Sequence, residues 1–319
     1  MLNSTEGLIF ATGKSYTTSS CRIPQGGNAA RVDGCSGVMW VACPFLLIPT
    51  RMSEVVIITG ASSGLGLATA LHMHKNGYVV FGTSRNPEKY EKQFPFPFLF
   101  LENADPVSIQ SCVESVLNQT GRLDILINNA GVGITGPMEE IDLTDVKDHF
   151  EINCFGPMRM IQAVLPQMRK QKKGLIINIT SIAADMGLPF RGAYSAAKVA
   201  LERMSESIRL ESHSFGIRIC NLAPGDFVSN IAQRRHYAPL DKESPYFEMY
   251  KFSLDQINEH VDKGIDPNHI VRTIEEIIKT KKPKVRYKVG APLQKLSGVL
   301  KTLLPSRIFE KLLMNHYKL

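Results

Sequence analysis

The sequence lacks the cysteine spacing that metal sites and disulfide frameworks require. Its six cysteines include no Cys-x-x-Cys pair and no histidine partner at metal-ligand spacing, so we expect no metal ion. Cys112, Cys154 and Cys220 fall within apolar helical or strand patterns. Because a buried free cysteine behaves as a small apolar residue, this pattern predicts core positions in a reducing compartment such as the cytoplasm.

The apolar run near the N-terminus is too short to span a bilayer. Gly37 to Pro49 has about 13 residues, whereas a spanning helix needs about 20. The run also lies too far from the N-terminus for a signal-peptide core, and Cys43-Pro44 interrupts it. We therefore interpret residues 1–51 as a disordered or non-native extension and expect a domain over residues 52–290.

Acidic residues are scarce at the C-terminal end of the chain. Between Lys279 and Leu319, eleven Lys or Arg stand against Glu310 alone, while the whole chain carries a formal net charge of +7. The remainder of the chain is therefore slightly acidic. This distribution argues against a nucleic-acid-binding fold and marks out a basic C-terminal segment.

The tail over residues 291–319 combines that positive charge with apolar residues at helical spacing. A basic amphipathic helix can lie on an anionic membrane surface, or it can pack on its own domain with its lysines in solvent. The sequence leaves both readings open, so we expect a cytoplasmic protein with a candidate peripheral membrane contact. The apolar residues are Leu293, Leu296, Leu300, Leu303, Leu304, Ile308, Leu312 and Leu313.

A glycine-rich turn follows the first β-branched run of the domain. Val55 to Ile58 reads as a strand, and a helical pattern begins at Leu67. Strand, glycine turn and helix are the context of a dinucleotide site, because glycine lets the backbone approach a pyrophosphate and directs helix N-terminal amides at it. An ordinary tight turn is the alternative. The predicted contacts are Gly60, Ser62, Ser63, Gly64, Leu65 and Gly66.

The end of the second strand bears on the choice between NAD(H) and NADP(H). Tyr78 to Gly82 is followed by Thr83-Ser84-Arg85, with no acidic residue to accept hydrogen bonds from a free ribose 2′-hydroxyl. An arginine suits a 2′-phosphate because its guanidinium presents a fork of donors. We therefore predict NADP(H) rather than NAD(H), with Ser84 and Arg85 as contacts; a surface arginine is the alternative.

Strands and helices alternate along the rest of the chain, which predicts an α/β fold: a Rossmann-type doubly wound parallel sheet of about seven strands with helices on both faces. The aromatic segment at residues 226–264 is either a lid over an apolar substrate or helices that cover the sheet end. The predicted strands are Val55–Ile58, Tyr78–Gly82, Phe98–Leu101, Leu123–Ile127, Gly174–Thr180, Ile217–Leu222 and Lys284–Val289. The predicted helices are Leu67–Asn76, Pro106–Thr120, Asp142–Lys170, Ala193–Leu210 and Pro267–Lys279.

Tyr194 and Lys198 stand four residues apart, and Ser181 ends the apolar strand before them. On a helix, residues i and i+4 share a face, so an ammonium lies beside a phenol and favours its ionised form. Such a phenol can act as an acid or a base, and the Ser181 hydroxyl can hydrogen-bond a substrate oxygen. Asn153, in the predicted helix Asp142–Lys170, is either an inward-facing group that holds water or an exposed polar residue.

These motifs resemble, in order and spacing, the short-chain dehydrogenase/reductase family over Ser53 to about Val289. The C-terminal tail resembles the branch with hydroxysteroid- and retinol-dehydrogenase-like members. One departure is Glu102-Asn103, where many members carry Asp-Val against the adenine. The motifs are Thr59-Gly60-x-x-x-Gly64-x-Gly66, Asn128-Asn129-Ala130-Gly131, Asn153, Ser181, Tyr194-x-x-x-Lys198 and Pro224-Gly225.

The resemblance implies that Tyr194 is the general acid/base, that Ser181 orients the substrate oxygen, that Lys198 also contacts the nicotinamide ribose, and that Asn153 anchors a relay water. Phe190 is expected to contact substrate together with Ser181 and Tyr194. Further cofactor contacts are expected at Asn129, Ala130, Gly131, Tyr194, Lys198, Pro224, Gly225 and Val228.

The function expected from these residues is an NADP(H)-dependent oxidoreductase that interconverts a ketone or aldehyde with an alcohol, on an apolar steroid-, retinoid- or lipid-like substrate. A non-catalytic dinucleotide-binding regulator or scaffold is the alternative, although such proteins usually lose the tyrosine or the lysine. The resemblance also implies a homo-oligomer, a dimer or tetramer.

Overall fold

The computed structural model describes residues 53–227, 235–262 and 264–319. The predicted extension at residues 1–51 and the predicted cofactor contact Val228 therefore lie outside the described residues.

Seven strands of the described ranges form one sheet, in the spatial order β3-β2-β1-β4-β6-β7-β9, and every neighbouring pair is parallel. All residues of β1, β4 and β6 are buried, as expected for strands covered on both faces. The predicted doubly wound fold is confirmed. The strands are β1 (Val55–Ile58), β2 (Val79–Ser84), β3 (Phe98–Phe100), β4 (Ile125–Asn128), β6 (Gly174–Ile179), β7 (Ile217–Pro224) and β9 (Arg286–Val289).

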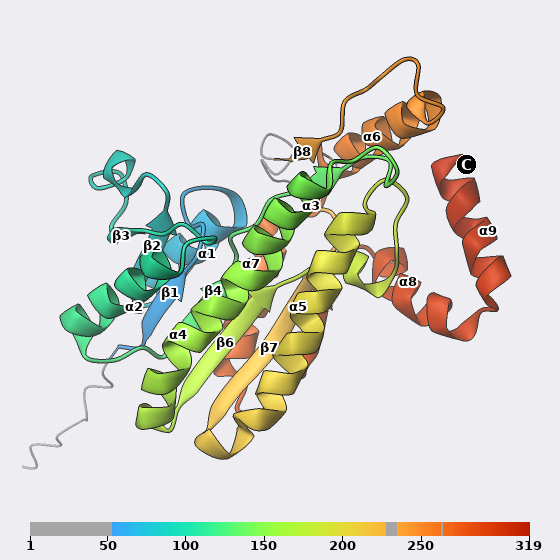
Figure 1. Cartoon of the computed structure of the whole chain (residues 1–319). Helices are drawn as coiled ribbons and strands as arrows, with labels where there is room; N and C mark the ends of the chain where they lie inside the picture. The colour runs from blue at the N-terminus through green and yellow to red at the C-terminus, as the bar shows by residue number, and fades with distance from the viewer. Residues whose placement is uncertain (1–52, 228–234, 263) are drawn as a thin grey trace, which may run out of the picture. The chain divides into compact units, whose positions relative to one another are not determined.

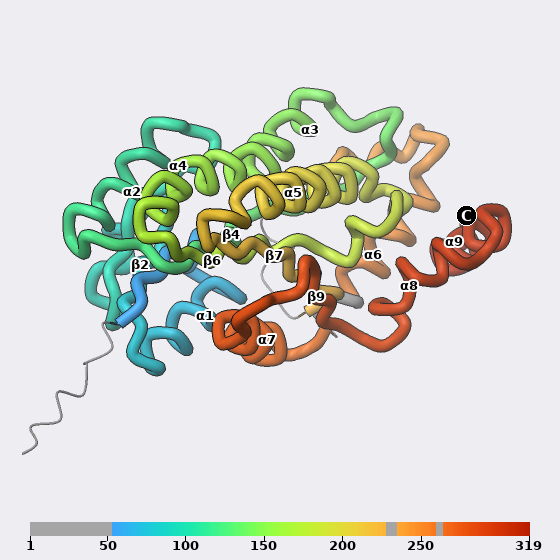
Figure 2. Tube along the Cα trace, turned by 90° about the horizontal axis from the view of Figure 1, so that it is seen from below, coloured from blue at the N-terminus to red at the C-terminus, as the bar shows by residue number. Residues whose placement is uncertain are grey.

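Helices cover both faces of this sheet (Figures 1 and 2). One face carries α2 (Pro106–Thr120), α4 (Gly156–Gln171) and α5 (Gly192–Glu211); the other carries α1 (Gly64–Lys75) and α7 (Pro267–Lys279). Alternate strand residues supply the two cores because successive side chains point to opposite faces. Val55 and Ile57 pack in the first core, and Val56 and Ile58 in the second.

The strand order reverses direction between β1 and β4, the two central strands. The chain leaves β1 toward β2 and β3 and then crosses back to β4. In open α/β sheets, ligands bind outside the carboxyl ends of the strands at such a switch point. The glycine turn follows β1 and the Asn129–Gly131 stretch follows β4, so both lie at this position.

The region predicted as one helix, Asp142–Lys170, is helical throughout from Leu143 but contains a π-helical turn. It consists of α3 (Leu143–Phe150), a π-helical turn (Glu151–Phe155) and α4. The Asn153 side chain donates from Nδ2 to the backbone oxygen of His149 at 3.1 Å, which places it in competition with the main chain for that acceptor. Asn153 is 1% exposed, so of the two readings it is the inward-facing one.

The segment at residues 226–264 follows β7, and its described part is more helical than the loop-rich lid that we considered. It contains α6 (Phe247–Asp262) and β8 (His236–Tyr237), which pairs with β5 (Ile134–Thr135). Tyr250 on α6 is 1% exposed and donates from its hydroxyl to the backbone oxygen of Thr135 at 3.0 Å. The aromatic residue therefore anchors the helix over the end of the sheet.

The tail forms two helices, α8 (Pro292–Leu303) and α9 (Ser306–Tyr317), with Pro305 between them. A proline cannot continue the hydrogen bonding of α8, which explains the break. Leu293, Leu296 and Leu303 on α8 are 71%, 53% and 74% exposed. Within the ranges that the structure describes, no helix is long and apolar enough to cross a membrane.

Candidate active site

The glycine turn has the backbone that only glycine adopts readily. Gly60 and Gly64 have φ angles of 65° and 55°, in the left-handed region. A Cβ on Gly66 would overlap the backbone oxygen of Gly60 and lie 2.5 Å from Nδ2 of Asn129. The turn is therefore closed against the end of β4 at Gly60 and Gly66, whereas Gly64 has open space around it and needs glycine for its φ angle.

Thr59 joins the two halves of the switch point. Its Oγ1 accepts hydrogen bonds from the backbone amides of Asn129 and Ala130, both at 2.9 Å, and Asn129 Nδ2 donates back to the Thr59 carbonyl at 2.9 Å. Gly131 follows, where a Cβ would lie 2.7 Å from Oδ1 of Asn153. The Asn129–Gly131 stretch is thus fixed between the glycine turn and the π-helical turn.

The residues of this region fit a dinucleotide. Ser63 is the N-cap residue of α1 but makes no side-chain capping bond, so it does not occupy the first amides of the helix, which suit a pyrophosphate. Ser62 and Ser63 are half-buried beside the turn. Leu65 is 5% exposed and packs into the core, so only its backbone is available to a cofactor.

Ser84 and Arg85 lie at the carboxyl end of β2, next to the strand that carries the glycine turn. Arg85 is exposed, and it forms no ion pair with any residue that the structure describes. Asn103, at the departure from the family pattern, is buried, and a Cβ on Gly156 would lie 2.8 Å from its Cβ. Asn103 therefore packs against the start of α4.

Ser181, Tyr194 and Lys198 come together where β6 ends and α5 begins. Ser181 Oγ accepts from the amide of Ala183 at 3.1 Å, in the 3₁₀ turn Ile182–Asp185. Lys198 is 6% exposed, donates to the backbone oxygen of Ile179 at 3.1 Å, and has its Nζ 5.9 Å from the centroid of the Tyr194 ring. The end of β6 thus binds Lys198 directly, and Tyr194 lines the same cleft as the serine.

Asn153 faces this group from the π-helical turn. Its Oδ1 accepts from the amide of Val132 at 3.2 Å, and its Nδ2 lies 3.1 Å from Nδ1 of His149. The His149 ring is 5.9 Å from the ring of Tyr194. Our sequence analysis missed His149, although its spacing of four residues from Asn153 was a usable signal.

His149 is a buried neutral group. It is 3% exposed, and its Nε2 has no hydrogen-bond partner among the described residues. Burial, followed by the positive charges of Lys198 and His236, lowers the pKa of His149 to about 3. The imidazole therefore carries no charge near neutral pH.

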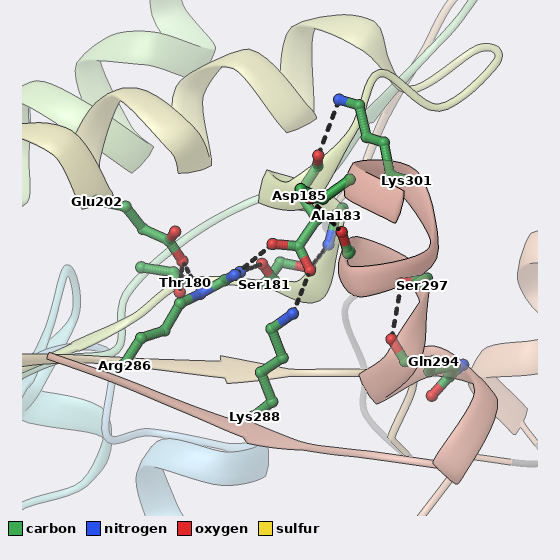
Figure 3. A network of polar contacts seen from close by, with 12 residues as sticks. Thr180, Ser181, Ala183, Asp185, Glu202, Arg286, Lys288, Gln294, Ser297 and Lys301 are labelled. Atoms are coloured by element: carbon green, nitrogen blue, oxygen red, sulfur yellow. Dashed lines mark hydrogen bonds and ion pairs between the residues drawn. The ribbon is translucent and has the colours of Figure 1, made fainter. Parts of the chain in front are cut away.

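Charged side chains from β9 and α5 bind the serine turn, which is the stretch from Thr180 to Asp185 that contains Ser181 (Figure 3). Arg286 on β9 donates from Nη2 to the backbone oxygen of Ser181 at 3.1 Å, from Nε to Glu202 at 3.0 Å, and from Nη1 to Asp185. Glu202 also accepts from Thr180 Oγ1 at 2.7 Å. Burial raises the pKa of Glu202, and the nearby Arg286 opposes this effect. Arg286 thereby ties β9 and α5 to the turn that follows Ser181.

Helix α8 and strand β9 complete the network. Lys288 on β9 donates to Asp185 at 2.7 Å, and Lys301 on α8 donates to the Asp185 backbone oxygen at 3.0 Å. A Cβ on Gly298 of α8 would lie 2.5 Å from Oδ2 of Asp185, so the helix packs closely on the turn. The predicted tail therefore packs on the turn that follows Ser181.

A cleft of about 520 Å³, including its opening to solvent, adjoins these residues. Ser181, Tyr194, Pro224 and Gly225, which we predicted as substrate or cofactor contacts, line it. Phe190 does not line it; it packs on Tyr250 with ring centroids 5.4 Å apart. The other lining residues are Gly133, Ile134, Thr135, Thr180, Arg191, Asp226, Phe227 and Arg235.

A glycine turn at the end of β1, together with a serine, a tyrosine and a lysine where β6 ends and α5 begins, is the arrangement expected of a dinucleotide-dependent oxidoreductase, and the protein is an enzyme of this class. Residues 54–238 match the family model for short chain dehydrogenase, and the chain belongs to that family.

Two curated proteins and one solved structure are similar over most of their lengths. The chain is 37% identical over 265 residues to a 3-ketodihydrosphingosine reductase of Bacteroides thetaiotaomicron, covering 83% of this chain and 98% of that protein. It is 28% identical to an NADPH-dependent 3-dehydrocapnine reductase of Ornithobacterium rhinotracheale, covering 82% and 96%. A short-chain dehydrogenase structure from Streptomyces avermitilis superposes with a TM-score of 0.73 at 31% identity, covering 82% and 98%.

The buried neutral His149 predicts a pH dependence of stability. The folded state keeps the ring uncharged down to about pH 3, whereas the unfolded state takes up a proton below about pH 6.5, so stability is lost as the pH falls from 6.5 toward 3. From pH 7 to pH 5, the wild type should lose about 2 kcal/mol more unfolding free energy than His149→Gln.

Urea titrations at the two pH values measure this difference. The exposed His213 supplies the control, and His213→Gln should retain the wild-type dependence. The same pH dependence in His149→Gln and the wild type would contradict the assignment.

The contact between Arg286 and Ser181 predicts a coupling in catalysis. Because small displacements of catalytic groups are costly, Arg286→Met should lower kcat by about 10- to 100-fold while leaving the KM for NADPH unchanged. In a Ser181→Ala background the same substitution should have little further effect, since the two residues act as one unit.

Steady-state kinetics of the two single variants and the double variant test this coupling. Arg218→Met is the control, because Arg218 donates to the backbone oxygen of Thr280 and neither residue lines the cleft. Losses that multiply in the double variant would show that Arg286 acts independently of the serine.

Proposed function

We propose that the protein is an NADP(H)-dependent oxidoreductase that interconverts a ketone or aldehyde with an alcohol, with Tyr194 as general acid/base. The observation that carries this proposal is the placement of Ser181 and Tyr194 in one cleft with Pro224 and Gly225. Proton donor, oxygen-binding hydroxyl and nicotinamide contacts would then meet at a single carbonyl carbon.

The proton and the substrate oxygen are handled by side chains of this chain. When bound, the nicotinamide supplies or accepts the hydride. In the reducing direction, the Tyr194 hydroxyl gives its proton to the carbonyl oxygen. Ser181 Oγ accepts from the Ala183 amide, which leaves its own O–H to donate to that same oxygen.

Lys198 and Asn153 support this transfer. One of the three N–H donors of Lys198 binds the Ile179 oxygen, so two remain for a ribose hydroxyl and for the relay. Its positive charge stabilises negative charge on the tyrosine oxygen. Asn153 would anchor the relay water, with His149 fixing the orientation of its amide.

For the cofactor, we propose NADP(H) over NAD(H). The exposed guanidinium of Arg85 at the end of β2 suits a 2′-phosphate, and no acid replaces it there. The similarity to a reductase named as NADPH-dependent supports the same choice.

For the substrate, we propose a lipid-like carbonyl or alcohol. The relative that is named a 3-ketodihydrosphingosine reductase supports this class, and Ile134 and Phe227 supply apolar surface in the cleft. The presence of both Tyr194 and Lys198 disfavours the non-catalytic regulator or scaffold.

We also propose that the cytoplasmic enzyme contacts anionic membranes through α8 and α9. The exposed leucines of α8 lie among basic residues, and Gln294 of α8 donates to Asp226, which lines the cleft. An apolar substrate could then enter from the bilayer. The homo-oligomer implied by the family resemblance stays a prediction, which analytical ultracentrifugation would test.

Tyr194→Phe should lower turnover by about 10²- to 10⁴-fold, the range that general acid–base catalysis contributes, because the phenol supplies the transferred proton. NADPH binding should be unchanged. NADPH and NADH oxidation over long-chain ketones, steroids, retinoids and small aldehydes measures activity and cofactor preference together. A fully active Tyr194→Phe enzyme would refute the proposed role, and a preference for NADH would refute that of Arg85.

The membrane contact predicts cosedimentation of the protein with vesicles that contain phosphatidylserine, and weaker cosedimentation with phosphatidylcholine alone. Leu293→Ser combined with Leu303→Ser should remove most of the binding because it deletes exposed apolar surface. Leu210→Ser is the control, since Leu210 is 78% exposed on α5. Equal losses in both variants would contradict a contact specific to α8.

A further inference from the structure

Two guanidinium groups from separate segments lie in the cleft beside the predicted catalytic residues. Arg191 is the N-cap residue of α5, and Arg235 directly precedes β8. Both line the cleft together with Ser181 and Tyr194. The guanidinium carbon of Arg191 is 5.5 Å from the centroid of the Tyr194 ring.

Neither arginine forms an ion pair with a described residue. Arg235 Nη1 donates to the amide oxygen of Asn258 at 3.0 Å, and Arg191 bonds the hydroxyl of Tyr317. Asp226 lines the same cleft, but its carboxylate accepts from Gln294 Nε2 at 2.7 Å instead. Both guanidinium groups thus have neutral partners in the described part of the chain.

This arrangement is electrostatically unfavourable without an anion. Burial lowers the pKa of Arg235, and the nearby charge of Arg191 adds to this effect. A partly buried cation without a counter-ion is a cost that an anionic ligand removes. Guanidinium groups bind carboxylate, sulfonate and phosphate oxygens through paired donors.

The position of the pair separates it from the predicted cofactor phosphate sites. The pyrophosphate is expected at the glycine turn and the 2′-phosphate at Arg85, and none of those residues lines the cleft. Arg235 instead lies beside Gly133, where a Cβ would meet its side chain at 2.8 Å, and Arg191 lies over the Tyr194 ring. They therefore face the space beside Tyr194.

We propose that Arg191 and Arg235 form a binding site for an acidic group of the substrate, so that the enzyme acts on a lipid-like ketone or alcohol that also carries a carboxylate, sulfonate or phosphate. This proposal rests on the proposed function, because it takes the cleft as the substrate site. The two arginines determine specificity and leave the proton transfer at Tyr194 unchanged.

Binding of decanoate and of decanol to the NADP⁺-loaded full-length protein tests the site without turnover. Titration calorimetry should show tighter binding of decanoate, weakened about tenfold in Arg191→Gln and in Arg235→Gln, with decanol unaffected. Arg203→Gln is the matched control, since Arg203 is exposed and paired with Glu206. Equal binding of the two probes, or an equal loss in the control, would overturn the proposal.

A second arm compares a long-chain methyl ketone with the keto acid of the same chain length. The wild type should show the higher kcat/KM for the keto acid, and each arginine variant should lower that value toward the value for the neutral ketone. A raised KM for NADPH with both ketones would assign the arginines to the cofactor and overturn the proposal.

The two arms separate this proposal from the proposed function. Decanoate binding that depends on the arginines, without reduction of either ketone, would refute the proposed function and leave the acidic-group site supported. Reduction of the neutral ketone with no preference for the keto acid would refute the acidic-group site and leave the proposed function supported. Two independent arginine positions keep the test decisive if one variant fails to fold.

Discussion

The position of Ser181 depends on how the carboxyl end of β6 is held. Three charged side chains bind this short stretch: Lys198 at the Ile179 oxygen, Glu202 at the Thr180 hydroxyl, and Arg286 at the Ser181 oxygen. A buried strand end must satisfy its polar groups, and here α5 and β9 do so. The same contacts join α5, which carries Tyr194, to the strand end that carries Ser181, so a structural requirement of the sheet also positions the predicted catalytic groups.

The cofactor half of the site follows a comparable rule at the centre of the sheet. Thr59 Oγ1 accepts two amides from the segment after β4, and the glycine turn closes against that segment without room for a side chain. Asn153 then contacts the same segment from the π-helical turn. These contacts hold the central strands together and also shape the predicted cofactor site. The residues that would select a substrate lie outside them.

Several residues that contact the serine turn or the cleft lie beyond the family match at residues 54–238. Arg286, Lys301 and Tyr317 all follow this range, yet they contact the serine turn or a residue that lines the cleft. The C-terminal segment that carries the positive charge is thus part of the active-site region. The cleft also has charged residues beside its apolar ones, which the expectation of an apolar substrate did not include.

The sequence by itself determined the sheet, the glycine turn and the Tyr194-Lys198 pair, because hydrophobic periodicity, glycine spacing and the i, i+4 relation are local properties. Strand ends moved by at most two residues, and the predicted helix over 142–170 contains a π-helical turn at Asn153, whose side chain bonds the His149 oxygen and the Val132 amide. Arg286 at the serine turn, the Arg191–Arg235 pair and the buried His149 came only from the tertiary structure. These residues are far apart in the chain or outside any motif, and their roles depend on which side chains the fold brings into contact and on how far it removes them from water.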